Sequence, residues 1–190
     1  MRAEDKIFQA FFDARQSKLY YSQLKEQTRL SHSSLQNALE KLSKAQTVRQ
    51  EKTKSNLFYK ICDKEIFVIR FSEIAIKKFR NLNLEVKIPL ENFLENLPKD
   101  IFTIVLFGSA SKKEETKDSD IDLLIVTNTK RDFKDNKKNA EITSKHPISI
   151  FQCSVHEFID NKDDVIFQAR KTGFPVYKEQ NFYEVMLDEY

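Results

Sequence analysis

Residues 101–126 read IFTIVLFGSASKKEETKDSDIDLLIV, which is two apolar runs separated by a polar segment. The first run, 101–107, is rich in β-branched and aromatic residues and ends at Gly108. The second run occupies 121–126. Runs of this length and composition, bounded by polar residues, predict two buried strands joined by a polar connection.

The turn after the first run contains Gly108 and Ser109, and Gly108 is one of only 2 glycines in the chain. A residue without a Cβ lets an anion approach the backbone closely. A helix that began just after this turn would point free N–H groups at such an anion. The sequence therefore predicts a phosphate-binding turn here.

Two carboxylates, Asp120 and Asp122, stand at the start of the second run. Side chains at positions i and i+2 of a strand share a face, with their Cα atoms roughly 6.5–7 Å apart. Paired carboxylates bind hard cations such as Mg²⁺, and without a cation they repel each other. The pair therefore predicts a cation site beside the phosphate-binding turn.

The order of these features resembles the motif of the minimal nucleotidyltransferases, in the DNA polymerase beta superfamily. The residues at the matching positions are Gly108, Ser109, Ser119, Asp120 and Asp122. The resemblance covers about residues 88–178 and implies a small mixed sheet with packed helices. It also implies transfer of a nucleoside monophosphate from a nucleoside triphosphate, with ATP the expected one, to an acceptor hydroxyl.

The resemblance assigns a role to each matching residue. Asp120 and Asp122 would be catalytic and would bind Mg²⁺, or Mn²⁺ in its place. The nucleotide would be bound by Gly108, Ser109, Lys112 and Ser119, although Lys112 could equally be a solvated loop lysine.

Two departures from the family pattern leave catalysis open. Lys112 and Lys113 stand where family members often have Arg and Gly. The next expected strand, 147–154, carries no third carboxylate, so Ser149 or Gln152 would take its place, unless the fold brought in Glu141 or Glu157. The alternatives to an enzyme are a nucleotide-sensing transcriptional regulator and an antitoxin-type protein that modifies a partner protein, both built on a degenerate transferase fold.

Charge is distributed unevenly along the chain. Residues 1–62 carry 12 Lys/Arg and 6 Asp/Glu, a net +6, whereas residues 63–190 carry 20 and 23, a net −3. A small basic unit is typical of proteins that bind nucleic acid, because lysine and arginine contacts to phosphate release counterions. Lysines that only maintain solubility would give the same counts.

The apolar pattern of residues 4–62 predicts three helices and a basic hairpin. The second helix would be capped by Ser22 and the third by Ser33, or alternatively by Ser31. This order resembles a winged helix-turn-helix domain, which implies binding to double-stranded DNA or, alternatively, protein contacts only. The DNA-binding residues would be Ser33, Ser34, Gln36, Asn37 and Lys41 on the third helix and Arg49, Lys52 and Lys54 on the hairpin.

The predicted fold class is α+β, in three parts. Residues 1–62 would form the winged helix domain, 63–87 a linker helix and 88–190 the nucleotidyltransferase-like domain. The linker is apolar on so much of its surface that it must bury more than one face, either between the two domains or against a second copy in a homodimer.

Several classes of protein are excluded. The chain has no GxGxxG, GxxxxGK[ST] or GxSxG motif, which argues against a Rossmann fold, a P-loop protein and a serine hydrolase. Its first residues do not form a secretory signal. No apolar stretch approaches the ~18 residues of a membrane span. Cys62 and Cys153 stand far apart without a CxxC partner, so we expect two reduced thiols in a cytoplasmic protein. The three histidines are expected at the surface or in local hydrogen bonds.

Overall fold

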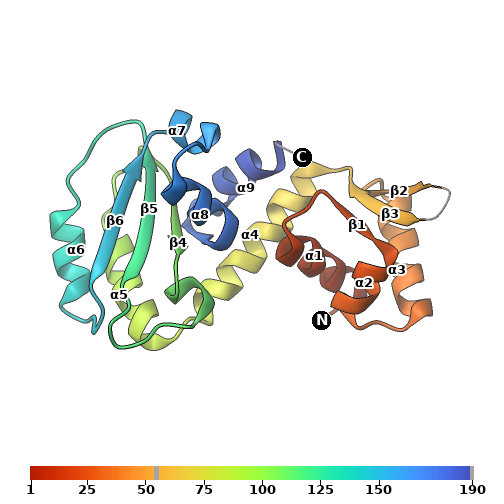
Figure 1. The fold of residues 1–190 in the computed structure, drawn as a ribbon, viewed down its shortest axis with the longest axis horizontal. Coiled ribbons are helices and arrows are strands. Elements are labelled where there is room, and N and C mark those ends of the chain that lie inside the picture. Colours follow the sequence, from red (N-terminus) through yellow and green to blue (C-terminus); the bar gives the residue numbers. More distant parts are fainter. Residues whose placement is uncertain (54–55, 189–190) are drawn as a thin grey trace. The chain divides into compact units, whose positions relative to one another are not determined.

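The computed structural model describes residues 1–53 and 56–188 (Figure 1). This part of the chain divides into two compact units. One unit consists of residues 1–74 and the end of the chain from Tyr183, and the other consists of Ala75–Phe182. Two helices, α4 (Lys64–Arg80) and α9 (Glu179–Asp188), contribute residues to both units.

The first unit contains three helices and a small antiparallel sheet. The helices are α1 (Ala3–Ala14), α2 (Tyr21–Thr28) and α3 (His32–Lys44). The strands are β1 (Lys18–Tyr20), β2 (Val48–Lys52) and β3 (Leu57–Ile61), in the order β1-β3-β2. The expected helices and hairpin are therefore present, and the sequence analysis missed only the short strand β1. The assignment of this unit as a winged helix stays a prediction.

The helix starts in this unit are set by polar groups near the first turn. Ser31, the alternative cap of α3, accepts a hydrogen bond from the Ser34 backbone at 3.2 Å. The prediction for α2 was wrong, since Ser22 lies inside that helix. Its first turn is closed by the Gln23 side chain, which accepts from the Tyr20 N–H at 2.8 Å. A side-chain carboxamide at the third helical position can accept from the N–H of the residue before the helix, which would otherwise lack a partner.

An aromatic cluster holds α4 and α9 to α1 within the first unit. The ring of Phe67 lies edge-on to Phe8 and Phe11, with centroid distances of 5.0 and 5.3 Å. Phe71 makes the same kind of contact with Tyr183 at 5.5 Å. Edge-to-face pairs of buried rings stabilise a core beyond their area alone. Phe67 and Phe71 of α4 are thus buried within one chain, whereas Ile69 is 49% exposed, and the homodimer stays a prediction.

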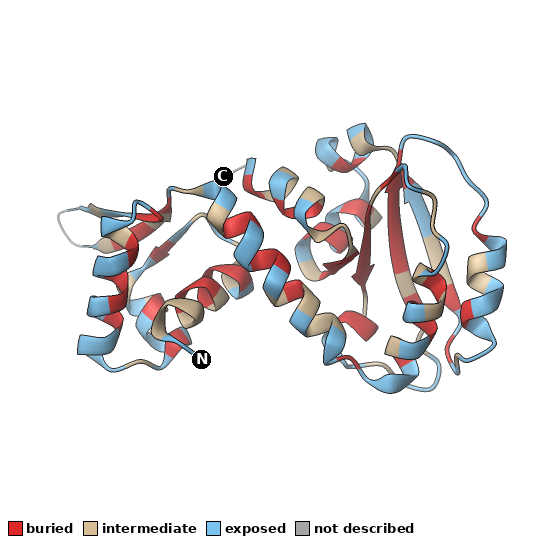
Figure 2. Ribbon diagram, turned by 180° about the vertical axis from the view of Figure 1, so that it is seen from behind, coloured by how far each residue is buried: buried red, intermediate tan, exposed pale blue. Residues whose placement is uncertain are grey.

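The second unit is a mixed sheet with helices packed against it. The strands are β4 (Ile101–Phe107), β5 (Ile121–Thr127), β6 (Ile148–Cys153) and β7 (Phe174–Tyr177), in the order β6-β5-β4-β7. Only the pairing of β5 with β6 is parallel. The helices are α5 (Leu84–Leu94), α6 (Lys134–Glu141), α7 (Val155–Asp160) and α8 (Asp164–Thr172). The central strands β4 and β5 are buried along nearly their whole length (Figure 2). The α+β class and the mixed sheet with packed helices are confirmed.

Two helices in this unit depart from simple local patterns. Proline commonly opens a helix, whereas Pro89 lies inside α5. The helices α7 and α8 are separate, because Asn161 adopts a left-handed conformation with φ 53° and ends α7. Asparagine tolerates this region better than most residues, so it can end a helix where no glycine is present.

Gly173 has a second role besides ending α8. A Cβ at this position would lie 2.6 Å from two backbone oxygens, those of Ala169 and Leu106. Only glycine therefore lets the end of α8 approach β4 this closely. None of the helices in the described part of the chain is long and apolar enough to cross a membrane.

Candidate active site

The two strands predicted from residues 101–126 run antiparallel, so the end of β4 meets the start of β5 at one edge of the sheet. Phe107, the last residue of β4, pairs with Asp122. On the other side of β5, Asp122 is in register with Ser149 of β6. The backbone pairing thus brings Gly108, the two aspartates and Ser149 to one corner of the second unit.

Gly108 is needed at this corner for two physical reasons. Its φ is +68°, a region that residues with a Cβ rarely adopt. A Cβ here would also lie 2.2 Å from Oδ2 of Asp122. The backbone of the turn therefore lies close to the Asp122 carboxylate. Glycine fits at this position because it has no Cβ to collide with that carboxylate.

The helix expected after this turn is reduced to one short 3-10 turn, Ala110–Lys112. Ser111 closes it by donating from Oγ to the Gly108 carbonyl at 2.8 Å. A helix dipole builds up over several turns of aligned peptides, so the predicted contribution of a helix N-terminus to anion binding was wrong.

Asp120 and Asp122 are both half-buried, and Asp120 lies close enough to affect the ionisation of Asp122. Burial raises the pKa of the Asp122 carboxyl, and the negative charge of Asp120 raises it further. Ser149 donates a hydrogen bond from Oγ to Oδ2 of Asp120 at 2.7 Å. Two carboxylates and one hydroxyl thus converge at the corner, and neither carboxylate forms an ion pair with a basic side chain in the described ranges.

This donor set fits a divalent cation. Carboxylate oxygens are the ligands that Mg²⁺ and Mn²⁺ prefer, and Mg²⁺ is commonly held by one or two carboxylates together with water and substrate phosphates. Burial and the charge of Asp120 both raise the pKa of Asp122, so a bound cation would offset the cost of ionising this carboxyl. Within the described ranges, no group of three or more His, Cys, Asp or Glu side chains could hold a metal ion, so the protein itself would supply only the pair.

The candidates for a third carboxylate have other partners. Glu141 accepts from the Ile148 N–H at 3.3 Å and pairs with Lys137. Glu157 caps α7 by accepting from the backbone and the hydroxyl of Ser154. Gln152 hydrogen-bonds the backbone of Arg131. Of the two residues of β6 that the sequence analysis offered for this place, the structure brings Ser149 to the pair.

The other predicted nucleotide-binding residues lie on the loop between β4 and β5. Ser109 begins the 3-10 turn, and Lys112 ends it with an exposed side chain. Ser119 directly precedes the carboxylate pair, but its hydroxyl closes the loop by accepting from the Thr116 N–H at 2.8 Å. Ser109 thus follows Gly108 directly and Lys112 lies in the same short turn, whereas the Ser119 side chain supports the loop.

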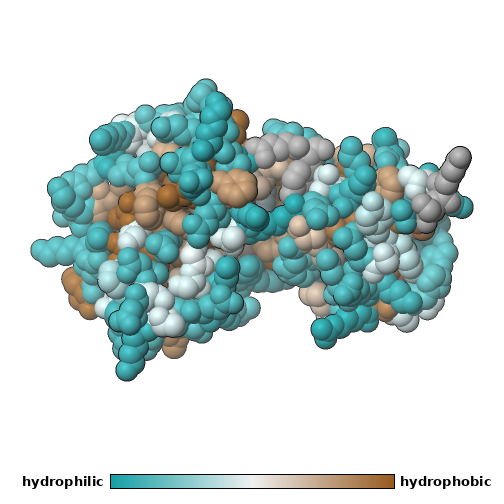
Figure 3. Space-filling model, viewed as in Figure 1, coloured by the Kyte–Doolittle hydropathy of each residue, from teal (hydrophilic) through white to brown (hydrophobic). Residues whose placement is uncertain are grey.

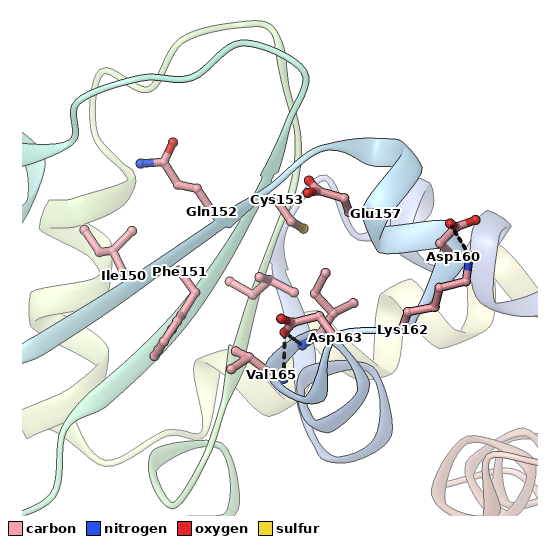
Figure 4. Close-up of a pocket in the computed structure, with 11 residues that line it drawn as sticks. Ile150, Phe151, Gln152, Cys153, Glu157, Asp160, Lys162, Asp163 and Val165 are labelled. Atoms are coloured by element: carbon pink, nitrogen blue, oxygen red, sulfur yellow. Dashed lines mark hydrogen bonds and ion pairs between the residues drawn. The ribbon is translucent and has the colours of Figure 1, made fainter.

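A pocket of about 500 Å³ lies on the same face of the sheet as Asp122. Because side chains alternate along a strand, Leu124 and Phe151 continue the face that Asp122 and Ser149 begin. Figure 4 shows Phe151 directed toward this pocket, with Gln152 pointing the opposite way. Its rim carries three carboxylates and one lysine, which are Glu157, Asp160, Asp163 and Lys162. Apolar side chains also gather on this part of the surface (Figure 3).

The predicted DNA-binding residues that the structure describes are all exposed. Ser33, Ser34, Gln36, Asn37 and Lys41 lie on α3, and Arg49 and Lys52 lie on β2. Ser33 and Ser34 are partly committed to hydrogen bonds with the Ser31 cap. Lys41 forms an ion pair with Glu4 at 3.3 Å. Lys54 lies outside the described residues.

One residue at the corner escaped the sequence analysis. His146 was expected at the surface or in a local bond, but it is only 6% exposed and lies 3.0 Å from the carbonyl of Ser119 through Nδ1. Its partner is 27 residues away, so neither spacing nor periodicity could have indicated the contact. The remaining signal, a histidine just before an apolar strand, is shared by many surface loops.

Comparison with known proteins agrees with the geometry of the second unit. Residues 89–182 match the family model described as polymerase beta, nucleotidyltransferase. The match spans just under half of the chain and supports a domain of the minimal nucleotidyltransferase family in this segment. Searches of curated proteins and of solved structures returned no match.

Proposed function

We propose that the chain is a metal-dependent nucleotidyltransferase that transfers a nucleoside monophosphate from a nucleoside triphosphate to an acceptor hydroxyl. The observation that supports this most directly is the close approach of Asp122, with Asp120 beside it, to the backbone of Gly108, within a segment that matches a nucleotidyltransferase family. ATP is the proposed nucleotide and Mg²⁺, or Mn²⁺, the proposed cation. The free state of both cysteines fits a cytoplasmic location.

Each group at the corner would have a distinct task. Gly108 and Ser109 would bind the triphosphate, with Lys112 adding positive charge. Asp120 and Asp122 would hold the cation, which when bound neutralises phosphate charge and orients the in-line attack. The acceptor oxygen would bond to the α-phosphorus, pyrophosphate would leave, and a carboxylate of the pair would take the acceptor's proton.

Ser149 would be a positioning residue in this site. Its hydroxyl donates to Asp120 and so fixes one oxygen of the pair. A serine in place of a third carboxylate also lowers the negative charge at the corner, which favours the approach of a triphosphate.

The neighbouring pocket is best suited to the acceptor. Its rim holds three carboxylates against one lysine, and this excess of negative charge would repel a triphosphate. Its apolar floor begins two residues beyond Asp122 on the same face. An acceptor bound there would lie beside the carboxylates with its hydroxyl toward Asp122.

The proposal is tested by incubating the protein with labelled ATP, Mn²⁺ or Mg²⁺ and candidate acceptors. We expect Asp120→Asn to reduce transfer about a thousandfold, as loss of a cation ligand does. Asp118→Asn removes an equal charge from the same loop at an exposed position and should leave transfer unchanged. Equal activity of the two variants, or a wild type that neither transfers nor binds nucleotide, would refute the proposal.

A second candidate function is supported by the first unit. Its exposed polar helix face and basic hairpin favour a winged helix that binds double-stranded DNA, and the single pair of carboxylates would suit a regulator that senses a nucleotide without transferring it. The same arrangement would also suit modification of a partner protein, as in an antitoxin-type role.

DNA binding is tested by a gel-shift series at increasing salt. Replacing Lys41 and Lys52 by alanine should weaken binding uniformly across sequences and reduce the salt dependence by about one ion per lysine. Lys138→Ala and Lys162→Ala, which remove lysines from the second unit, serve as controls. If all four variants bound DNA alike, the assignment of α3 and β2 as the interface would fail.

A further inference from the structure

The chain that leads into β6 is bonded to the backbone on both sides of Asp120. The strands β5 and β6 are parallel and lie side by side, so their first residues are neighbours (Figure 1). Before Asp120, the carbonyl oxygen of Ser119 lies 3.0 Å from Nδ1 of His146. After Asp120, the Ile121 N–H donates to the Pro147 carbonyl at 2.8 Å. Both peptide groups that flank the Asp120 Cα are therefore held by one short segment.

Holding these two peptide groups fixes the direction of the Asp120 side chain. A peptide group is planar, so a bond to its oxygen or to its N–H restrains the whole group, including the adjacent Cα. With both planes restrained, only the side-chain torsions of Asp120 remain free. Ser149 restrains these as well, because its hydroxyl donates to Oδ2 at 2.7 Å. The start of β6 thus holds both the backbone and the carboxylate of Asp120.

The ring of His146 is buried, and its contact with Ser119 determines which nitrogen carries the proton. The side chain is only 5% exposed. A carbonyl oxygen can only accept, so Nδ1 must donate. The other nitrogen, Nε2, lies 4.0 Å from Oε2 of Glu85 and has no hydrogen-bond partner among the described residues. The ring therefore directs its one donor at Ser119, and burial protects this bond from competing water.

The backbone of His146 is held in turn by its own neighbours. The Ser144 hydroxyl accepts from the His146 N–H at 3.0 Å and donates to the His146 carbonyl at 2.6 Å. Lys145 forms an ion pair with Glu85 of α5. These contacts connect the segment to a helix that lies outside the β4–β5 loop. The ring is thus fixed independently of the loop that it contacts.

We propose that His146 is a positioning residue for Asp120, acting through the carbonyl of Ser119. Its N–H keeps the carboxylate in the orientation in which the pair binds a divalent cation. The property that matters is the donor at Nδ1, and not the volume of the ring. The inference rests on the proposed function for the identity of the cation site, but it does not need transfer to occur, because cation binding can be measured without nucleotide.

The test compares two carboxamides at position 146. In His146→Asn the side-chain N–H₂ takes the place of Nδ1, whereas in His146→Gln it takes the place of Nε2. Binding of Mn²⁺ to the whole chain, followed by electron paramagnetic resonance without nucleotide, should weaken about tenfold in His146→Gln and less than about twofold in His146→Asn. His156→Gln changes an exposed histidine of α7 and should bind Mn²⁺ like wild type.

The transfer assay supplies a second readout, one that a general loss of stability would not give. The Mn²⁺ concentration for half-maximal transfer should rise about tenfold in His146→Gln, while kcat at saturating Mn²⁺ stays within about threefold. Thermal melting shows whether each variant is folded. If His146→Gln does not fold, Ser144→Ala takes its place: it releases the His146 backbone and should weaken Mn²⁺ binding about threefold.

The outcomes distinguish this inference from the proposed function. The positioning role would be overturned by equal Mn²⁺ affinity in wild type and His146→Gln (or Ser144→Ala in its place), by equal losses in the two carboxamide variants, or by no saturable Mn²⁺ binding at about 10 mM in wild type. A wild type that binds Mn²⁺ with the expected order of variants but transfers no nucleotide would support the role of His146 and refute the transferase. Transfer by wild type with unchanged Mn²⁺ dependence in the variants would do the reverse.

Discussion

Both units contain left-handed residues that carry a side chain, but glycine occurs only in the second unit. The first unit contains no glycine, and α1 and α2 end at arginines in the left-handed region, Arg15 and Arg29, with φ of 49° and 51°. The second unit holds both glycines, at positions where a Cβ would meet another atom at 2.2 to 2.6 Å. Glycine is thus retained where space requires it and not simply where φ is positive.

The two units also differ in how exposed their charged side chains are. Most of the lysines and arginines that the structure describes in the first unit are exposed, so each would act on a partner independently and with screening by salt. The second unit holds Asp120 and Asp122 half-buried and in electrostatic contact. Single substitutions should therefore have small effects in the first unit and large ones in the second.

The largest contrast is expected for the two cysteines, one in each unit. Cys62 is exposed, whereas burial, with smaller effects of Glu157 and Asp163, raises the pKa of Cys153 to about 12. Because only the thiolate reacts, iodoacetamide at pH 8 should label Cys62 about a thousandfold faster than Cys153. Peptide mass spectrometry over a time course would measure both rates. Comparable rates would show that Cys153, at the end of β6, is not buried as the structure has it.

The same pKa predicts how stability depends on pH. Between the usual thiol value of about 8.5 and 12, the folded protein keeps the Cys153 proton that the unfolded chain releases. Stability should therefore fall as pH rises above about 8.5, and Cys153→Ala should remove that part of the decline. Denaturant unfolding at several pH values would test this, with Cys62→Ala as the control.

The next effect concerns the glycines. Gly173→Ala places a Cβ against backbone oxygens that cannot move aside, so we expect a loss of about 3 kcal/mol in the free energy of unfolding. Gly108→Ala meets the movable end of the Asp122 side chain and should cost about 1–2 kcal/mol from its φ. Gly108→Ala should nevertheless impair nucleotide binding more than Gly173→Ala does, because it displaces the Asp122 carboxylate. This comparison applies to the molecules of each variant that remain folded. Urea unfolding and nucleotide titration separate the two, and the reverse order of stabilities would contradict the packing argument.

A smaller effect is expected at Ser149. Ser149→Ala removes the hydrogen bond to Asp120 and should reduce transfer about tenfold, with Mn²⁺ affinity falling in parallel. Ser149→Thr keeps the hydroxyl and serves as the rescue. If the alanine variant bound Mn²⁺ as tightly as wild type, Ser149 would have no positioning role.

The smallest effect belongs to the first unit. Arg29→Gly relieves a left-handed arginine and should stabilise the protein by about 1 kcal/mol. Lys25→Gly removes the same charge within α2 and should destabilise by about the same amount. Thermal melts of the two variants would isolate the contribution of the backbone conformation. If the melting temperatures of both variants shifted in the same direction, the left-handed conformation of Arg29 would not explain the effect.

The parts of the fold that the sequence predicted are those decided by local pattern. The strands of the second unit are recognisable because each is an apolar run with polar ends, and the helices of the first unit have clear apolar spacing. The three-residue strand β1 was missed because its pairing with β3, and not a local pattern, decides it.

The candidate site divides in the same way. Gly108, Asp120 and Asp122 could be predicted, since their chemistry depends on residues close in sequence. Choosing Ser149 over Gln152 needed the register between β5 and β6, and the contact of His146 with Ser119 needed the path of the chain before β6.

Both connections between the units lie inside helices. The boundary falls within α4, after Ile74, and again within α9, before Tyr183. A fragment that ended near residue 62 would lack Phe67, Phe71 and Tyr183, and so most of the aromatic packing around α1. Transfer of the first unit to another protein would therefore require two separate stretches of the chain, residues 1–74 and the segment that begins at Tyr183.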